Sequence, residues 1–167
     1  MRKAIPISLI LIAACSGEPR QTEQGARPPS KVEEWAAIAS APKPGPENTM
    51  LVDLQLQVTV TDGWHVYSLT QDTGGPTPMS VSVDPPYAIN GDIVAPQPVK
   101  ATDPNFGIET ETYSGEQVFT IPLRLTASSS VAPPPIQVKV RSQACSDNLC
   151  LPARTTRLTV TPESGTT

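Results

Sequence analysis

The chain has 167 residues, 20 of them proline, and a formal net charge of −4. This length fits one domain, and the many prolines indicate that part of the chain lies outside a packed core. No run of Lys or Arg follows the first three residues. The mildly acidic charge therefore argues against a surface that binds nucleic acid or anionic lipid headgroups.

Residues 1–14 have the order of an export signal. Arg2 and Lys3 precede a short apolar run that ends in small residues before Cys15. The run is too short to span a bilayer. Residues 12–15 resemble a bacterial lipobox, which implies that Cys15 is lipidated and becomes the first residue of the mature chain. The alternative is an ordinary signal peptide followed by an incidental cysteine.

The lipobox resemblance implies a location in the bacterial cell envelope. Ser16, rather than an aspartate, follows Cys15, which implies an outer-membrane lipoprotein that faces the periplasm and touches the membrane only through its lipid.

Residues 15–47 are rich in Pro, Gly, Gln, Ser and charge, and we interpret them as a tether. Within the tether, residues 31–38 contain good helix formers, and Ser30 with Glu33 fits a capping box. We predict one or two helical turns there.

The folded domain is predicted over residues 48–162, followed by a polar tail at 163–167. Apolar and polar residues alternate in a series of short segments bounded by turn signals. Pro122 should place its strand at an edge or a bulge, and residues 95–108 form a long irregular segment of the kind that is usually functional or mobile. The predicted strands are 50–60, 63–69, 79–83, 87–94, 119–125, 136–145 and 154–160.

These short strands, spaced about ten residues apart without a long helix, predict an all-β fold. The expected architecture is an antiparallel β-sandwich of immunoglobulin-like size. A domain of this length can bury its own core without a disulfide.

Cys145 and Cys150 are the two cysteines that remain if Cys15 carries a lipid, and an exported protein lives where disulfides persist. If strands 136–144 and 154–160 pair, both cysteines stand near the base of one hairpin, and a disulfide between them is plausible. The strand phase places Cys145 on the face opposite Ala144, which suggests an outer, reachable bridge. A bridge across so short a loop stabilises by only about 2 kcal/mol. From the residue types alone, a passive structural bridge and an exchange site both remain open.

Four segments carry a resemblance to a known family. Residues 143–152, with the cysteine pair, resemble the redox motif of the N-terminal periplasmic domain of the thiol:disulfide interchange protein DsbD. The other matches, in the same order as in that family, are residues 62–68, 75–78 and 113–125. Together they extend over about residues 48–162.

The resemblance implies an immunoglobulin-like fold and an electron relay by thiol–disulfide exchange with periplasmic thioredoxin-fold proteins. By position, Cys150 would form the mixed disulfide with the partner and Cys145 would resolve it. Residues 103–107 would form a cap that begins at Asp103, with Phe106 as the shielding ring. His65 and Tyr67 match strand positions beside the cysteines.

The implied system has no cofactor, and the domain is expected to be a monomer. Two cysteines and one distant histidine leave the ligand set of a zinc site short. The family protein continues into a membrane-spanning domain and a thioredoxin-like domain, so here a separate membrane protein is expected to donate the electrons.

The alternative function is a non-catalytic binding or assembly module with a stapling disulfide. Likewise, His65 is either a proton shuttle or an ordinary strand histidine, and Phe106 is either a cap or a loop anchor.

Overall fold

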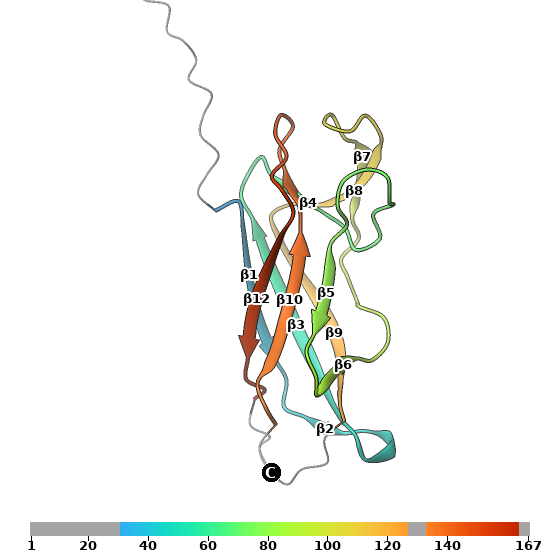
Figure 1. Ribbon diagram of the computed structural model, residues 1–167, viewed down its shortest axis with the longest axis vertical. Helices are drawn as coiled ribbons and strands as arrows, with labels where there is room; N and C mark the ends of the chain where they lie inside the picture. The colour runs from blue at the N-terminus through green and yellow to red at the C-terminus, as the bar shows by residue number, and fades with distance from the viewer. Residues whose placement is uncertain (1–30, 127–132, 164–167) are drawn as a thin grey trace, which may run out of the picture.

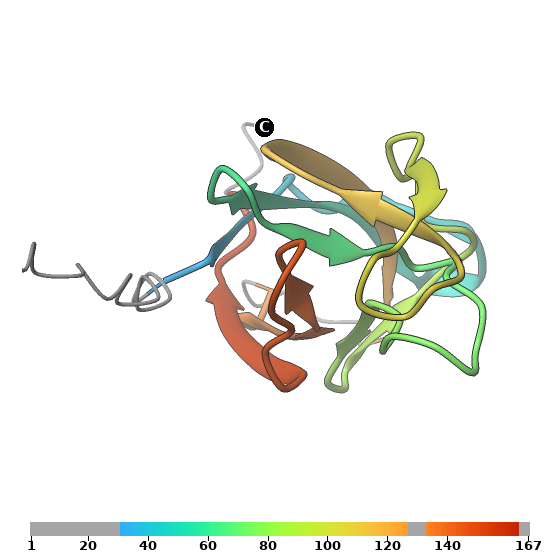
Figure 2. The same cartoon turned by 90° about the horizontal axis from the view of Figure 1, so that it is seen from above.

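The computed structural model describes residues 31–126 and 133–163. Its strands form three antiparallel sheets (Figures 1 and 2). The first has the order β1-β3-β9-β6, with the short β2 also paired to β3; the second is β12-β10-β5; and the third, β11-β4-β8-β7, lies at one end of the molecule. The bounds are β1 Glu33–Ala39, β2 Lys43–Pro44, β3 Met50–Val60, β4 His65–Tyr67, β5 Ser80–Val83, β6 Tyr87–Ile89, β7 Val99–Thr102, β8 Glu109–Tyr113, β9 Glu116–Leu125, β10 Ile136–Ser142, β11 Ala144–Cys145 and β12 Arg154–Val160, with a 3₁₀ turn at Pro46–Asn48.

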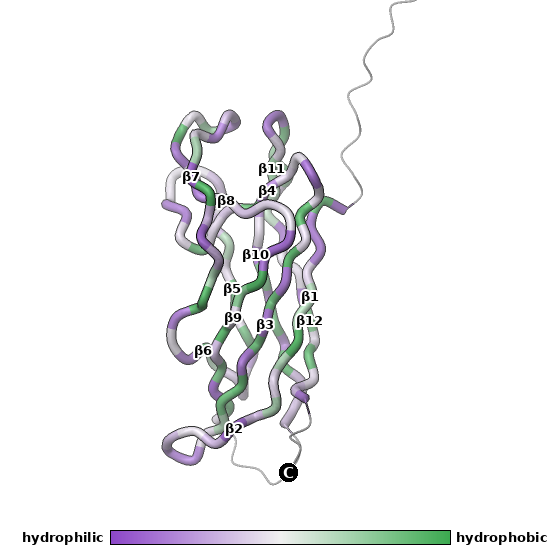
Figure 3. The backbone as a smooth tube through the Cα atoms, turned by 180° about the vertical axis from the view of Figure 1, so that it is seen from behind, coloured by the Kyte–Doolittle hydropathy of each residue, from purple (hydrophilic) through white to green (hydrophobic). Residues whose placement is uncertain are grey.

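The architecture is the predicted immunoglobulin-like antiparallel β-sandwich. Side chains alternate between buried and exposed along β3 and β10, and the hydropathy pattern of the strands follows this alternation (Figure 3). The buried residues of β3, β9 and β10 form the centre of the core. The period-two pattern in the sequence thus identified both the strands and the faces that they bury.

The segment expected to make helical turns is instead a strand. β1 pairs with β3 over its whole length, from Glu33 opposite Val60 to Ala39 opposite Leu54. Trp35 is only 7% exposed and belongs to the core. The prediction of a helix at 31–38 was wrong because pairing with β3 and burial of Trp35 outweigh local helix propensity. The sheet therefore begins before residue 48, within the segment interpreted as a tether.

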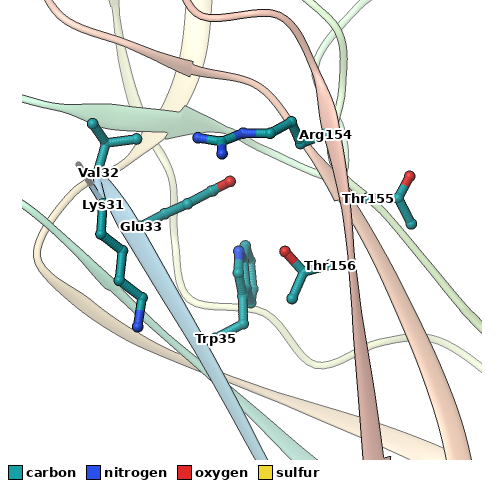
Figure 4. A pocket seen from close by; sticks show the side chains of 7 residues that line it. All are labelled: Lys31, Val32, Glu33, Trp35, Arg154, Thr155 and Thr156. Atoms are coloured by element: carbon teal, nitrogen blue, oxygen red, sulfur yellow. The ribbon is translucent and has the colours of Figure 1, made fainter. Parts of the chain in front are cut away.

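β1 and β12 run side by side in the same direction and connect the edges of the two long sheets (Figure 1). At one end of this seam, the Glu163 amide donates to the Ala39 carbonyl at 3.1 Å. At the other end, the strands enclose a cavity of about 360 Å³, into which Glu33, Trp35 and Arg154 turn (Figure 4). The Ser142 hydroxyl donates to Glu33 Oε1 at 2.8 Å, so β1 is also tied to β10.

Pro122 lies neither on an edge strand nor in a bulge of β9. β9 pairs with β3 on one side and with β6 on the other. On the β6 side, the Pro122 carbonyl accepts from the Asn90 amide at 2.8 Å, while Thr120 exchanges two hydrogen bonds with Val94. The proline thus sits where the β6 ladder is interrupted, and its missing N–H costs no bond to β3.

The segment predicted to be irregular contains a strand. β7 pairs with β8, and all four residues of β7 are exposed. An edge strand with no buried face leaves no alternation to detect in the sequence. In the part of the chain that the structure describes, no helix has the length and apolarity that crossing a membrane requires.

Candidate redox site

Cys145 and Cys150 form a disulfide at the end of the β10–β12 hairpin. The predicted pairing of these strands is confirmed, from Ile136 opposite Val160 to Ser142 opposite Arg154. Beyond it, Leu151 donates to the Ala144 carbonyl at 2.9 Å, and Ser146 donates to the Leu149 carbonyl at 2.8 Å. The turn between the cysteines is therefore closed by backbone hydrogen bonds as well as by the bridge.

The two cysteines differ in exposure. Cys145 is 0% exposed, whereas Cys150 is partly exposed. The expectation that Cys145 faces outward was wrong, because the chain leaves β10 at Gln143 and enters the third sheet. There Cys145 pairs with His65 of β4 and Ala144 pairs with Val66. An attacking thiolate can therefore approach the bridge only from the Cys150 side.

The predicted cap segment, residues 103–107, is the tip of the β7–β8 hairpin. Asp103 donates its amide to the Ile108 carbonyl at 2.8 Å, and its carbonyl accepts from Gly107 at 2.7 Å. Gly107 has a φ of +69°, a backbone conformation that favours glycine. This tip and the cysteine turn extend from the same end of the molecule (Figure 1). The Asn105 Nδ2 donates to the Ser146 carbonyl at 2.8 Å and joins them.

Asp103 anchors the cap segment to β4. Its side chain is 1% exposed. Oδ1 accepts from the amides of Asn105 at 2.7 Å and Phe106 at 3.3 Å, and Oδ2 accepts from the Tyr67 hydroxyl at 2.6 Å. Burial alone would raise the pKa of Asp103, but the hydrogen bonds from Tyr67, Asn105 and Phe106 outweigh it and lower the pKa. Asp103 is therefore a buried carboxylate that stays ionised.

Tyr67 connects the cap to the disulfide. Its hydroxyl lies 4.0 Å from Cys150 Sγ and 3.3 Å from His65 Nε2. The pKa of Tyr67 is raised far above its ordinary value, mainly by burial. The hydrogen bond to Asp103 and the negative charge of Asp103 raise it further. The phenol thus keeps its proton. The ring of Phe106 packs edge-on against Tyr67, with centroids 6.2 Å apart.

A second carboxylate braces the hairpin that carries the cap. Glu111 of β8 accepts from Lys100 of β7 at 2.7 Å, from Ser68 at 2.9 Å and from Thr70. The hydrogen bonds from Lys100, Thr70 and Ser68 lower the pKa of Glu111 to about 2. The base of the hairpin is thereby held to the chain that follows β4.

The structure brings together six of the residues that the sequence singled out. Cys145, Cys150, His65, Tyr67, Asp103 and Phe106 come from three segments far apart in the chain. Cys15 lies outside the described residues. Among the described side chains, no group of three or more His, Cys, Asp or Glu residues is arranged to hold a metal ion.

Two contacts at this site were not foreseen. Asn105 was expected only as part of the cap, and its bond to Ser146 links two loops whose approach no local pattern shows. Gln143 Oε1 accepts from the Thr77 amide at 2.7 Å, and this residue opens the cysteine motif. The signal for Gln143 was present, because residues 75–78 and 143–152 both belong to the family resemblance.

Two of the solved structures that match this chain are N-terminal domains of bacterial proteins. The N-terminal domain of DsbD from Neisseria meningitidis, in its reduced form, is 18% identical with a TM-score of 0.47, and the match covers 67% of this chain and 78% of that one. The N-terminal periplasmic domain of ScsB from Proteus mirabilis is 19% identical with a TM-score of 0.49, covering 75% of this chain and 52% of that one. A search of curated proteins gave no match.

The family model of the N-terminal region of the thiol:disulfide interchange protein DsbD matches residues 34–162. This match extends over most of the chain and includes β1, the cap segment and both cysteines. The chain therefore belongs to the family of DsbD N-terminal domains.

Proposed function

We propose that this domain relays electrons by thiol–disulfide exchange between the Cys145–Cys150 pair and thioredoxin-fold proteins of the periplasm. The unequal exposure of the two cysteines carries the proposal, because Cys145 is 0% exposed and Cys150 is partly exposed. Exchange proceeds through a mixed disulfide, so one sulfur must meet the partner. In this assignment Cys150 forms the mixed disulfide, and Cys145 then attacks Cys150 to release the partner.

The way in which the cap segment is attached supports the same function. Residues 103–108 make their backbone hydrogen bonds with one another. They are tied to the rest of the site by side-chain contacts of Asp103, Asn105 and Phe106. A partner could displace the segment and reach Cys150 without breaking strand pairing. Phe106 would then act as the shielding ring in the closed state.

The alternative of a stapling disulfide has weaker support. The hairpin is already held by the β10–β12 ladder and by the backbone bonds of Ser146 and Leu151. Closing so short a loop adds only about 2 kcal/mol. A purely structural disulfide also does not explain why the Tyr67 hydroxyl and the buried carboxylate of Asp103 lie beside Cys150.

We further propose that the chain is exported and anchored in the outer membrane by a lipid on Cys15. The segment between Cys15 and β1 would then connect the lipid to the domain. Metabolic labelling with a radioactive fatty acid should mark the wild-type chain and leave a Cys15→Ala variant unlabelled. Equal labelling of both would refute the anchor. A separate membrane protein would supply the electrons, and the domain would work as a monomer.

A trapping experiment tests the exchange function. The Cys145→Ser variant cannot resolve a mixed disulfide, so it should accumulate a covalent complex with an oxidised periplasmic thioredoxin-fold protein. The matched Cys150→Ser variant should trap little, because Cys145 is buried. No complex with either variant would count against exchange. A bridge with a reduction potential well below about −300 mV would indicate a structural disulfide.

A further inference from the structure

His65 lies inside the cluster around the disulfide but does not contact a sulfur in any hydrogen bond. It is paired across the strands with Cys145, and its side chain is 16% exposed. Its Nε2 is 3.3 Å from the Tyr67 hydroxyl and 3.6 Å from Asp103 Oδ2. The rings of His65 and Tyr67 meet edge-on with centroids 5.2 Å apart. These contacts orient the imidazole toward the hydroxyl that faces Cys150.

The Tyr67 hydroxyl is placed to pass a proton. It has one hydrogen to donate and lone pairs to accept. Within its reach are Asp103 Oδ2 at 2.6 Å, His65 Nε2 at 3.3 Å and Cys150 Sγ at 4.0 Å. In the part of the chain that the structure describes, Tyr67 is the residue whose side chain makes a hydrogen-bond contact with Cys150 Sγ.

The groups of this cluster differ in how readily they take up a proton. The raised pKa of Tyr67 keeps the phenol protonated, and the lowered pKa of Asp103 makes that carboxylate a poor proton acceptor at neutral pH. Histidine, in contrast, is the side chain that commonly changes its charge between about pH 5 and pH 8. An imidazole at this place gives the cluster a suitable base.

We propose that His65 accepts the proton of the Cys150 thiol, through the hydroxyl of Tyr67, when the reduced domain attacks a disulfide. This inference rests on the proposed function and adds the route of the proton. The Tyr67 hydroxyl turns its hydrogen from Asp103 Oδ2 to Nε2 of neutral His65, which accepts it while the thiol proton passes to the Tyr67 oxygen. The Cys150 sulfur forms a bond to one sulfur of the attacked disulfide, and the other sulfur leaves as a thiolate.

The second half of the exchange returns the proton. Cys145 attacks Cys150, the Cys145–Cys150 bond forms, and the remaining sulfur of the attacked disulfide leaves as a thiolate. The two electrons of the pair have then moved to the two departing thiolates. One receives the proton released by Cys145, and the other receives the proton held on His65, directly or through water.

The charges around His65 favour this role. Its titratable neighbours are Tyr67 on its own strand, Asp103 on the cap segment, and the cysteine pair on the β11 side. Among the described residues, no Lys or Arg forms an ion pair with Asp103. The carboxylate is therefore free to stabilise an imidazolium 3.6 Å away. Neutral His65 accepts the proton, and Asp103 pairs with the cation that results.

The test uses the full-length reduced chain and a small aromatic disulfide that releases a coloured thiol, measured between about pH 5 and pH 10. The wild-type rate should show an inflection at a lower pH than the rise caused by direct ionisation of the thiol. His65→Gln should lose this inflection and react about tenfold more slowly near pH 7. The two rates should converge at alkaline pH, where solvent deprotonates Cys150.

A double substitution tests the route through Tyr67. Tyr67→Phe should also lose the inflection, and adding His65→Gln to Tyr67→Phe should cause no further loss. Superimposable profiles for the wild type and His65→Gln would overturn the inference, and so would a deficit that persists at alkaline pH, because that indicates a damaged fold.

Failure of the inference is distinguishable from failure of the proposed function. The aromatic disulfide replaces the partner, so the pH profile reports on His65 whether or not a thioredoxin-fold protein reacts. Superimposable profiles in a domain that still reduces such a protein would refute the role of His65 alone. No transfer to such a protein would refute the proposed function alone.

Discussion

Replacing Asp103 by Ala should loosen the cap and destabilise the domain, because three donors lose their acceptor. The amides of Asn105 and Phe106 lie in an exposed tip and can turn to water, so each costs about 0.5 kcal/mol. Tyr67 is 0% exposed, and its hydroxyl loses a charged acceptor 2.6 Å away, which costs about 2 kcal/mol. The free energy of unfolding should fall by about 3 kcal/mol at neutral pH.

Asp103→Asn is the matched control, since the amide keeps the shape and one acceptor oxygen. Its loss should be smaller. The pKa of Asp103 is lowered in the fold, so the contribution of its charge is present above the pKa of an unfolded aspartate and is lost as the pH falls through the folded value. The difference between the wild type and Asp103→Ala should therefore shrink in acid.

Urea unfolding of the oxidised proteins at neutral and acidic pH measures both effects. Alkylation of the reduced proteins adds a local readout, because a loosened cap should let an alkylating agent reach Cys150 sooner. Equal unfolding midpoints at neutral pH, or a difference that does not diminish in acid, would refute the role assigned to Asp103.

The other predictions concern the cap, its brace and the first strand. Phe106→Ala should speed alkylation of the reduced cysteines several-fold while Ile108→Ala in the same hairpin does not; an unchanged Phe106→Ala rate would contradict shielding. Glu111→Gln should lower the free energy of unfolding at neutral pH by about 1–2 kcal/mol. The pKa of Glu111 is lowered to about 2. Urea unfolding should therefore show the full difference above the ordinary glutamate pKa, and the difference should vanish as the pH falls through about 2. Trp35→Ala should cost about 3–5 kcal/mol in the same assay, whereas a near-zero cost would mean that β1 is dispensable.

The sequence predicted the long strands well because their burial alternates. Val52, Leu54 and Leu56 all point into the core, as the period-two pattern required. The prediction failed for β1, where helix formers and a capping box indicated helical turns. The buried residues there, Trp35 and Ala39 with Val32 just before the strand, are spaced by three and four residues as in a helix. Only the ladder with β3 decides between a helix and a strand. A local pattern cannot contain that information.

At the candidate site, the residues were predictable and their orientation was not. The family resemblance placed His65, Tyr67, Asp103 and Phe106 near the cysteines, and the structure brings them together. The outward orientation of Cys145 was extrapolated from the alternation of β10, which ends at Ser142. No residue before the cysteines signals that the next pair, Ala144 and Cys145, joins another sheet.

This change of sheet explains why one short strand can govern both the sulfurs and the cap. β4 pairs with β11 on one side, which holds Cys145, and with β8 on the other, whose hairpin partner β7 leads into the cap segment. The cysteine pair and the cap are thus both positioned by β4, and the side chains of His65 and Tyr67 lie between them. Displacing the cap breaks the Tyr67 bond to Asp103 but leaves β4 paired with β11. His65 and Tyr67 would therefore stay beside the cysteine pair while the cap moves, and Asp103 would return to its place beside protonated His65 when the cap closes.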